Sequence, residues 1–141
     1  MGMFLLKTEP GEYSFEDLVR DKRTTWSGVT NAAALISIRS MRKGDEAFIY
    51  HTGDEKAIVG LAEVVKGPYE DPEQRGVTAK GEPKFAVVDV KAMRAAKTPV
   101  TLERIKGDKR FPEFALVKQS RLSVMAVPPA LEKVLRAWAG L

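Results

Sequence analysis

Short stretches of apolar residues, continuous or alternating with polar ones, predict the strands of this chain. Each is bounded by glycine, proline or other turn-forming residues, and together they cover Met3–Lys7, Glu46–His51, Ala57–Val65, Phe85–Met93 and Arg121–Val127. In the last stretch, alternation places Leu122, Val124 and Ala126 on the buried face and Met125 on the other. The short turn-rich segment between the second and third stretches indicates a hairpin.

Helices are predicted between and after these strands. Ser14 and Asp17 match a capping box at the start of a short helix, and Asn31 or Thr30 can cap a helix over AAALISIRSM. In the tail PPALEKVLRAWAGL, apolar residues recur at helical spacing, which predicts that Trp138 belongs to the core. The sum is an α+β fold whose short strands close into a small mixed β-barrel flanked by short helices.

The composition indicates a single domain spanning residues 1–141. With 44% hydrophobic residues, a chain of this length buries most of its apolar surface in one core. It has no cysteine, which excludes disulfides and cysteine-ligated metals, and we expect neither a metal nor a cofactor. No apolar run is long enough to cross a bilayer, and the start MGMFLLKTEP leaves no room for a signal peptide. We therefore expect a cytoplasmic protein with no membrane partner; its oligomeric state stays open.

The charge balance is mildly basic. The chain has 23 Lys and Arg against 19 Asp and Glu, a formal net charge of +4. Such an excess favours polyanions such as nucleic acid, although a solvated basic surface explains it equally well. Local clusters are the candidates for contacts with phosphate: Arg39, Arg42 and Lys43 in one place, and Lys118 and Arg121 in another.

Trp26 stands in an unusual place, in the Thr/Ser/Gly-rich turn TTWSGVTN. Tyr13, Phe15 and Tyr50 also lie in or beside turns and strand ends. Nucleobases stack on such aromatic faces, although core packing is the better interpretation for any one of these side chains. Their combination with polar residues at the ends of predicted elements is what indicates a pocket, and these polar residues are Asn31, His51, Arg121 and Ser123.

Lys7 and Glu9 alternate with their neighbours, so both point to the same face if the first strand continues. One interpretation is an exposed ion pair of little energetic value. The other is a polar pocket wall that reads the edge of a base, with Glu9 accepting and Lys7 donating hydrogen bonds. The residues alone do not decide between these interpretations.

The sequence carries no motif of a hydrolase or of a nucleotide-cofactor enzyme. His51 is the only histidine, and a histidine can act as a general base near neutral pH. Because no candidate nucleophile accompanies it, a structural or ligand hydrogen bond is the favoured interpretation. The long segment Gly67–Lys84 is rich in proline, glycine and charge, which indicates either a functional role or mobility.

Six ordered blocks of the chain together match a known family. They are FLLKTEPGEYSFEDL, TWSGVTN, MRKGDEAFIYH, IVGLAEVV, PYEDP and SRLSV. On these blocks the chain resembles the EVE domain family of the PUA-like superfamily, which is distantly similar to YTH and ASCH domains. The resemblance implies a PUA-like barrel that binds, without catalysis, a modified base such as a modified cytosine in DNA or RNA.

The resemblance also implies a set of binding residues. Trp26 would form a wall of the pocket for a flipped-out base, and Asn31 would offer its amide to the base edge. The full predicted set for the base is Lys7, Glu9, Tyr13, Trp26, Asn31, Tyr50, His51, Arg121 and Ser123. For the nucleic-acid backbone the predicted residues are Arg39, Arg42, Lys43 and Lys118.

The chain departs from the family pattern directly after the tryptophan. Where family members typically continue G-V-R-N-Y-Q-A-R, this chain has GVTNAAAL, so Thr30, Ala32, Ala33 and Leu35 replace two arginines, a tyrosine and a glutamine. We expect these changes to weaken phosphate contacts and to enlarge or redirect the pocket. Two alternatives therefore remain: an ASCH-like hydrolase of an amide or modified nucleoside, with Lys7, Glu9 and His51 as acid–base groups, and an interaction domain whose pocket has drifted.

Overall fold

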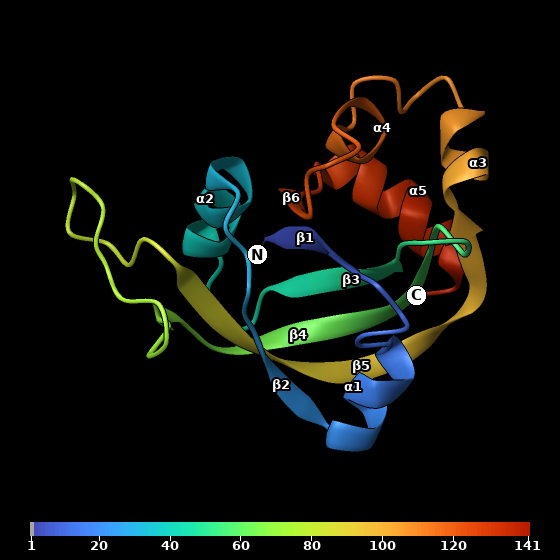
Figure 1. Cartoon of the computed structure of the whole chain (residues 1–141). Coiled ribbons are helices and arrows are strands. Elements are labelled where there is room, and N and C mark those ends of the chain that lie inside the picture. The colour runs from blue at the N-terminus through green and yellow to red at the C-terminus, as the bar shows by residue number, and fades with distance from the viewer. Residues whose placement is uncertain (1) are drawn as a thin grey trace.

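One strongly curled mixed sheet forms the framework of the computed structural model, which describes residues 2–141 (Figure 1). Its strand order is β2-β5-β4-β3-β1-β6. The strands are β1 (Met3–Thr8), β2 (Arg23–Trp26), β3 (Glu46–His51), β4 (Ala57–Glu70), β5 (Ala86–Thr101) and β6 (Val124–Ala126). Strands β1 and β3 pair in parallel, and the other neighbours are antiparallel.

Within residues 2–141, short helices flank this sheet: α1 (Phe15–Asp21), α2 (Ala32–Ser40), α3 (Leu102–Lys106), α4 (Ala115–Lys118) and α5 (Pro129–Ala139). The α+β class predicted from the sequence is confirmed. In the described residues, β2 and β6 lie at opposite ends of the strand order. The curled sheet is therefore not shown to close into a full barrel.

Local sequence signals determine where the helices begin. Ser14 accepts a hydrogen bond from the Asp17 amide, and the Asp17 carboxylate accepts one from the Ser14 amide, which confirms the predicted capping box. The Asn31 side chain caps α2 by accepting from the Ala34 amide. Both caps use only neighbouring residues, so the sequence is sufficient to predict them.

The core lies around β1 and β3, which are buried on both faces. Leu5 and Leu6 point to opposite sides of the sheet, and both are fully buried. Beneath α1, the Phe15 ring packs so closely on Gly60 that a Cβ atom there would lie 2.4 Å from the ring. At the other end of the molecule, Trp138 packs against Phe111 with ring centroids 5.6 Å apart; it was predicted in the core and is partly buried at the edge of the core.

The predicted strands differ from the structure in three places. β2 was predicted as part of a turn, but its residues pair with β5. β4 and β5 are longer than predicted, because register shifts along their pairing allow the strands to bend and continue past glycine and proline. β6 is shorter, and the predicted alternation is wrong there: Met125 is buried and Ala126 is exposed, because β6 borders a strand covered on both faces.

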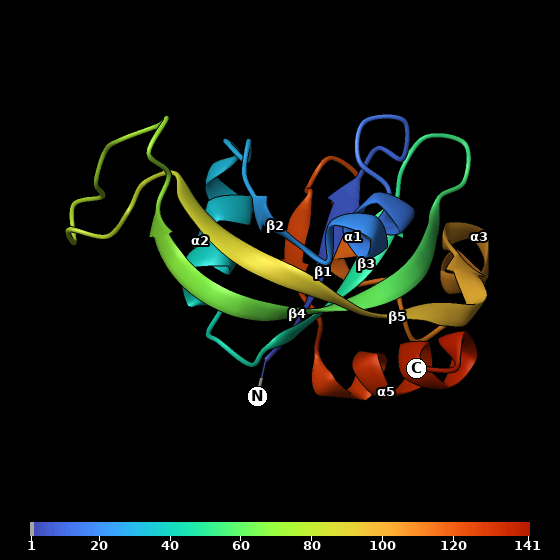
Figure 2. The ribbon, with the colours of Figure 1, turned by 90° about the horizontal axis from the view of Figure 1, so that it is seen from below.

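The segment between β4 and β5 forms a hairpin that projects from the sheet beside α2 (Figures 1 and 2). We call residues 71–85 the β4–β5 hairpin. An isolated bridge joins Val77 to Pro83 within it, and the Arg39 guanidinium donates hydrogen bonds to the Pro83 and Lys84 carbonyls at 3.4 and 3.1 Å. Among residues 2–141, no helix is long and apolar enough to cross a membrane.

Candidate functional site

A cavity of about 490 Å³ lies where the curled sheet brings its two edges together. The edge strand β2 forms one wall, and the end of β1 with Ser123 forms the other. The loop of residues 27–31, which leads into α2, runs along the cavity as well. We call this space the Trp26 cavity. Its volume falls in the range of about 300–1,000 Å³ that is usual for pockets that bind small ligands.

Trp26 is held in the cavity wall by the pairing of β2 with β5. Thr25 lies opposite Asp89 in this pairing, and Trp26 lies opposite Val88. The Asp89 carboxylate accepts hydrogen bonds from Thr25 Oγ1 at 2.8 Å and Tyr69 Oη at 2.6 Å. Because side chains alternate along a strand, anchoring Thr25 on one face directs Trp26 to the other.

The anchor on Asp89 is electrostatically stable. Burial opposes ionisation of this carboxylate, but the hydrogen bonds from Tyr69, Thr25 and Arg23 outweigh it and hold the pKa of Asp89 below its ordinary value. Arg23 lies 3.0 Å from Asp89 in an ion pair. The orientation of β2 therefore depends on a charged group that stays ionised at neutral pH.

The loop after β2 brings Asn31 to the cavity. Gly28 has a φ of 79°, a left-handed conformation that favours glycine and turns the chain away from β2. Asn31, at the end of this loop, lines the cavity. Its Oδ1 atom is committed to the Ala34 amide at 3.0 Å, so its amide N–H groups are the part of the side chain that can donate to a ligand.

Lys7 supplies a cation at the opposite wall. Its Nζ atom donates to the Ser120 carbonyl at 3.0 Å, and its backbone amide donates to the Ser123 carbonyl at 2.9 Å. Burial lowers the pKa of the Lys7 ammonium group. One hydrogen bond fixes the ammonium group and leaves donors for a ligand.

Glu9 supplies a carboxylate on the same wall and is held by its neighbours. Its Oε1 accepts from the Gly11 amide at 3.1 Å, and its Oε2 accepts from the Thr52 hydroxyl at 3.3 Å. Gly53 approaches this carboxylate so closely that a Cβ atom would lie 2.9 Å from Oε2. The structure thus places Lys7 and Glu9 in one cavity wall, where both face the same space.

Tyr13 and Ser123 complete the predicted residues that line the Trp26 cavity. The Tyr13 hydroxyl donates to Asp21 at 3.0 Å, which joins the cavity rim to the end of α1. Burial, with further contributions from Asp21, raises the pKa of the Tyr13 phenol. Tyr13 is therefore a neutral phenol at physiological pH.

Tyr50 and His51 do not line the Trp26 cavity. Both are 3% exposed. The Tyr50 ring lies behind Lys7, whose Nζ atom is 5.8 Å from the ring centroid. His51 Nε2 accepts from the Phe15 amide at 2.9 Å, and Nδ1 lies 2.8 Å from Glu55 Oε1. Both ring nitrogens of His51 are therefore already engaged within the protein.

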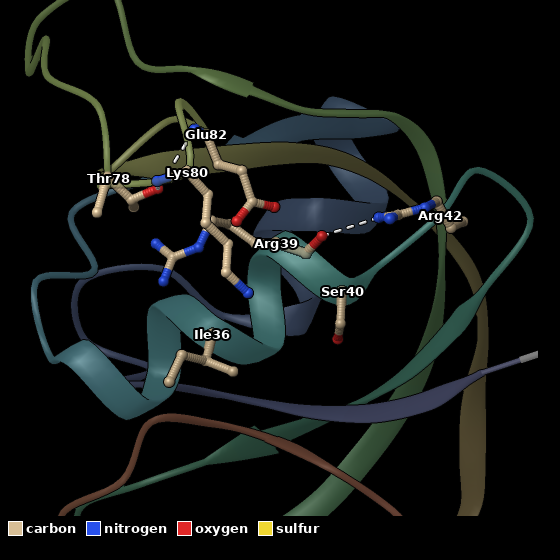
Figure 3. Close-up of a pocket in the computed structure, with 8 residues that line it drawn as sticks. Ile36, Arg39, Ser40, Arg42, Thr78, Lys80 and Glu82 are labelled. Carbon is tan, nitrogen blue, oxygen red and sulfur yellow. Dashed lines mark hydrogen bonds between the residues drawn. The ribbon is translucent and has the colours of Figure 1, made fainter.

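The predicted backbone-binding cations are dispersed. Arg39 and Arg42 line a second cavity beside α2 (Figure 3). Lys43 is exposed after this helix. Lys118 forms an ion pair with Glu113 at 2.5 Å. Arg121, which was predicted for the base, does not line the Trp26 cavity and is exposed in the turn that precedes Ser123. The structure therefore brings only part of the basic set together, at the end of α2.

Several residues of the cavity wall were not predicted from the sequence: Thr8, Glu12, Thr24, Thr25, Ser27, Val29 and Thr30. Alternation of Thr24 with Trp26 was the available signal for the β2 members. It was obscured because Ser27 and Gly28 made the stretch look like a turn. In the part of the chain that the structure describes, no cluster of three or more histidine or acidic side chains could hold a metal ion.

The chain is a small α+β domain with a curled sheet and a polar-rimmed cavity at the sheet edge, and such a cavity has the size and lining suited to a small ligand. Residues 2–137 match the EVE domain family, and the chain belongs to that family. Thymocyte nuclear protein 1 of Gallus gallus is 34% identical over 123 residues, covering 73% of this chain and 51% of the relative. The human protein is 34% identical over 124 residues, with 74% and 55% covered. The chain thus spans about half the length of these relatives.

Solved structures agree with this assignment. A protein from Rhodopseudomonas palustris has a TM-score of 0.88 and 39% identity, covering 99% of this chain and 94% of that one. Human THYN1 in complex with 5-methylcytosine-containing DNA has a TM-score of 0.85 and 27% identity, with 98% of each chain covered. An ASCH protein from Zymomonas mobilis, with a TM-score of 0.58 and 12% identity, shares the fold alone.

Proposed function

We propose that this EVE domain binds a modified nucleobase of DNA or RNA in the Trp26 cavity and performs no chemistry on it. The observation that carries the proposal is the composition of the cavity wall. An aromatic residue on β2 lies across from a cation and a carboxylate on β1, with an amide at the start of α2. A flipped-out base needs a stacking surface together with donors and acceptors for its edge.

The indole N–H of Trp26 strengthens the case. In the described residues, every fully buried side-chain nitrogen or oxygen has a hydrogen-bond partner. Trp26 is 9% exposed, and the Trp26 cavity is where this residue borders open space. A base carbonyl or ring nitrogen in the cavity would provide its acceptor.

The similar structures support the same function. Human THYN1 was solved with DNA that contains 5-methylcytosine, and it aligns with this chain over nearly its full length. We therefore choose 5-methylcytosine as the first base to test. The same assay, repeated with other modified bases and with RNA oligonucleotides, determines which base and which nucleic acid the domain prefers.

The arrangement of His51 favours binding over hydrolysis. A general base needs a free nitrogen near the reacting atom, whereas His51 Nε2 accepts from the Phe15 amide. This bond puts the ring proton on Nδ1, which donates to Glu55. Without a free histidine nitrogen, the role that we assign to Lys7 and Glu9 in the cavity is hydrogen bonding to a base edge.

Equilibrium binding of matched oligonucleotides with and without 5-methylcytosine tests the proposal. The modified oligonucleotide should bind more tightly, and Trp26→Ala should lose the stacking contribution of about 1–3 kcal/mol. Trp26→Phe should retain part of it, because the ring face remains. Trp138→Ala, at the other end of the molecule, is the matched control. Equal affinity for both oligonucleotides, with no loss in Trp26→Ala, would refute the proposal.

A further inference from the structure

Two further cavities continue from the Trp26 cavity along α2. The first, of about 410 Å³, shares Thr30 with the Trp26 cavity. The second, of about 610 Å³, shares Arg39, Thr78 and Ala79 with the first and is shown in Figure 3. Since each cavity shares lining residues with the next, the three lie next to one another. We call the part between α2 and the β4–β5 hairpin the α2 groove.

The chemistry of the α2 groove changes along its length. Near the Trp26 cavity its walls are mainly apolar, with Leu35 of α2 facing Val77 and Phe85 of the hairpin. Val77 is 65% exposed, so its apolar surface is available to a ligand. Farther along, the walls carry the cations Arg39, Arg42 and Lys80. An apolar surface followed by cations matches the base and phosphate of a nucleotide.

Two of the three cations are held in place by the protein. Arg39 donates to the Pro83 and Lys84 carbonyls, which fixes the hairpin against α2. Arg42 donates to the carbonyls of Arg39 and Met41 at 2.8 and 2.7 Å. A guanidinium has five N–H donors, so each arginine keeps donors for a phosphate. Because the side chains are already ordered, binding loses less conformational entropy.

Residues of the hairpin complete the outer part of the groove. Figure 3 shows Lys80 and Glu82 of the hairpin facing Arg39 across the space. The amides of Lys80 and Glu82 both donate to the Thr78 hydroxyl at 3.3 Å, which shapes the tip. Among the described residues, Glu82 is the one carboxylate that lines this cavity, so cations outnumber it there.

We propose that the α2 groove binds the nucleotide adjacent to the base held in the Trp26 cavity. The inference rests on the proposed function and extends it: the ligand is a strand of at least two nucleotides, not a free nucleoside. The shared residue Thr30 makes the two sites adjacent, and the cations supply the charge complementary to phosphate. The absence of a large side chain at Ala32, which also lines the groove, keeps its entrance open.

Calorimetric titration with two probes tests this proposal: the nucleoside 5-methyl-2′-deoxycytidine and a trinucleotide with the same base at its centre. Lys80→Ala and Arg42→Gln should weaken trinucleotide binding and leave nucleoside binding unchanged. Each should also reduce the slope of log affinity against log salt concentration by about 0.7, the value for one lost contact with single-stranded phosphate. Glu82→Gln should strengthen trinucleotide binding. Lys133→Ala, on α5 at the opposite end of the molecule, is the control and should change neither.

The outcomes distinguish the groove from the base cavity. If Lys80→Ala and Arg42→Gln keep the wild-type trinucleotide affinity and salt slope, the proposed nucleotide binding in the α2 groove is refuted. This holds whether or not the nucleoside binds. If Trp26→Ala does not weaken nucleoside binding, the proposal that the base binds in the Trp26 cavity is refuted instead. A poly-glutamate peptide that binds as tightly as the trinucleotide, with the same response to the variants, would assign the groove to an acidic protein partner and also overturn the proposal.

Discussion

His51 Nε2 accepts a hydrogen bond from the backbone amide of Phe15 at 2.9 Å, which ties the end of β3 to the first residue of α1. Through Nδ1, the same ring reaches Glu55 in the turn before β4. The imidazole therefore joins three segments of the chain beneath the loop that carries Glu9. Its buried position gives it a structural role.

Removal of the His51 ring should reduce stability and leave ligand affinity unchanged. In His51→Ala the Phe15 amide loses its buried acceptor, and the cost of an unsatisfied buried group is about 1–3 kcal/mol. Urea denaturation measures this loss, and nucleoside titration checks the affinity. Glu55→Gln is the control. It changes the 44% exposed partner of His51, so its effect on stability should be smaller. If nucleoside affinity falls while the free energy of unfolding stays unchanged, His51 contributes to ligand binding and the structural role is wrong.

Gly60→Ala should destabilise the domain through the contact between α1 and β4. The new methyl group would lie 2.4 Å from the Phe15 ring, and overpacking of this kind costs about 1–3 kcal/mol. Gly107→Ala is a suitable control, because its nearest atom is 3.4 Å away and its φ is −76°. Thermal denaturation should show a lower Tm for Gly60→Ala only; an unchanged Tm would mean that Phe15 is not packed on the strand.

The environment of Lys7 predicts a pH dependence of binding. Burial lowers the pKa of its ammonium group, and the group is charged below that pKa. Its contribution to nucleoside affinity should therefore be fully present well below the lowered pKa and be lost as the pH rises through it. NMR titration of reductively methylated lysines, with Lys7→Arg for assignment, measures the shift. A Lys7 pKa above its ordinary value would show that the Glu9 carboxylate outweighs burial.

Thr30→Arg should restore a phosphate contact at the rim shared by the Trp26 cavity and the α2 groove. Thr30 is exposed, so an arginine there can be accommodated, and the family pattern has arginine at this position. The slope of log affinity against log salt should become steeper by about 0.7 for a single-stranded ligand. Thr98→Arg, an exposed position near the far end of β5, controls for net charge. An equal effect of both variants would indicate a nonspecific charge effect.

The sequence predicted those features that depend on neighbouring residues. The caps at Ser14 and Asn31 are local, and they were predicted correctly. Strand β2 was missed because its four residues become a strand only by pairing with β5, more than sixty residues away in the chain. The length of β4 was underestimated for a related reason, because its bulges are stabilised by the partner strand.

The candidate site was partly predictable on the same grounds. Alternation along the first strand indicated that Lys7 and Glu9 face one space, and the position of Trp26 in a polar turn near Asn31 indicated a pocket there; both pairs line the Trp26 cavity. The sequence wrongly predicted Tyr50 in the cavity wall, because its position beside a strand end did not reveal that the ring is buried behind Lys7. The α2 groove was not predicted, since it forms only when the β4–β5 hairpin packs beside α2.

The central claim is that a base stacks on the Trp26 indole, and the chain allows a direct measurement of this contact. It has two tryptophans, so Trp138→Phe leaves Trp26 as the only indole fluorophore. Titration of this variant with 5-methyl-2′-deoxycytidine should quench the emission to saturation, with weaker binding of unmodified 2′-deoxycytidine. Emission that stays constant while calorimetry records binding would contradict the account, because the ligand would then occupy a site away from Trp26.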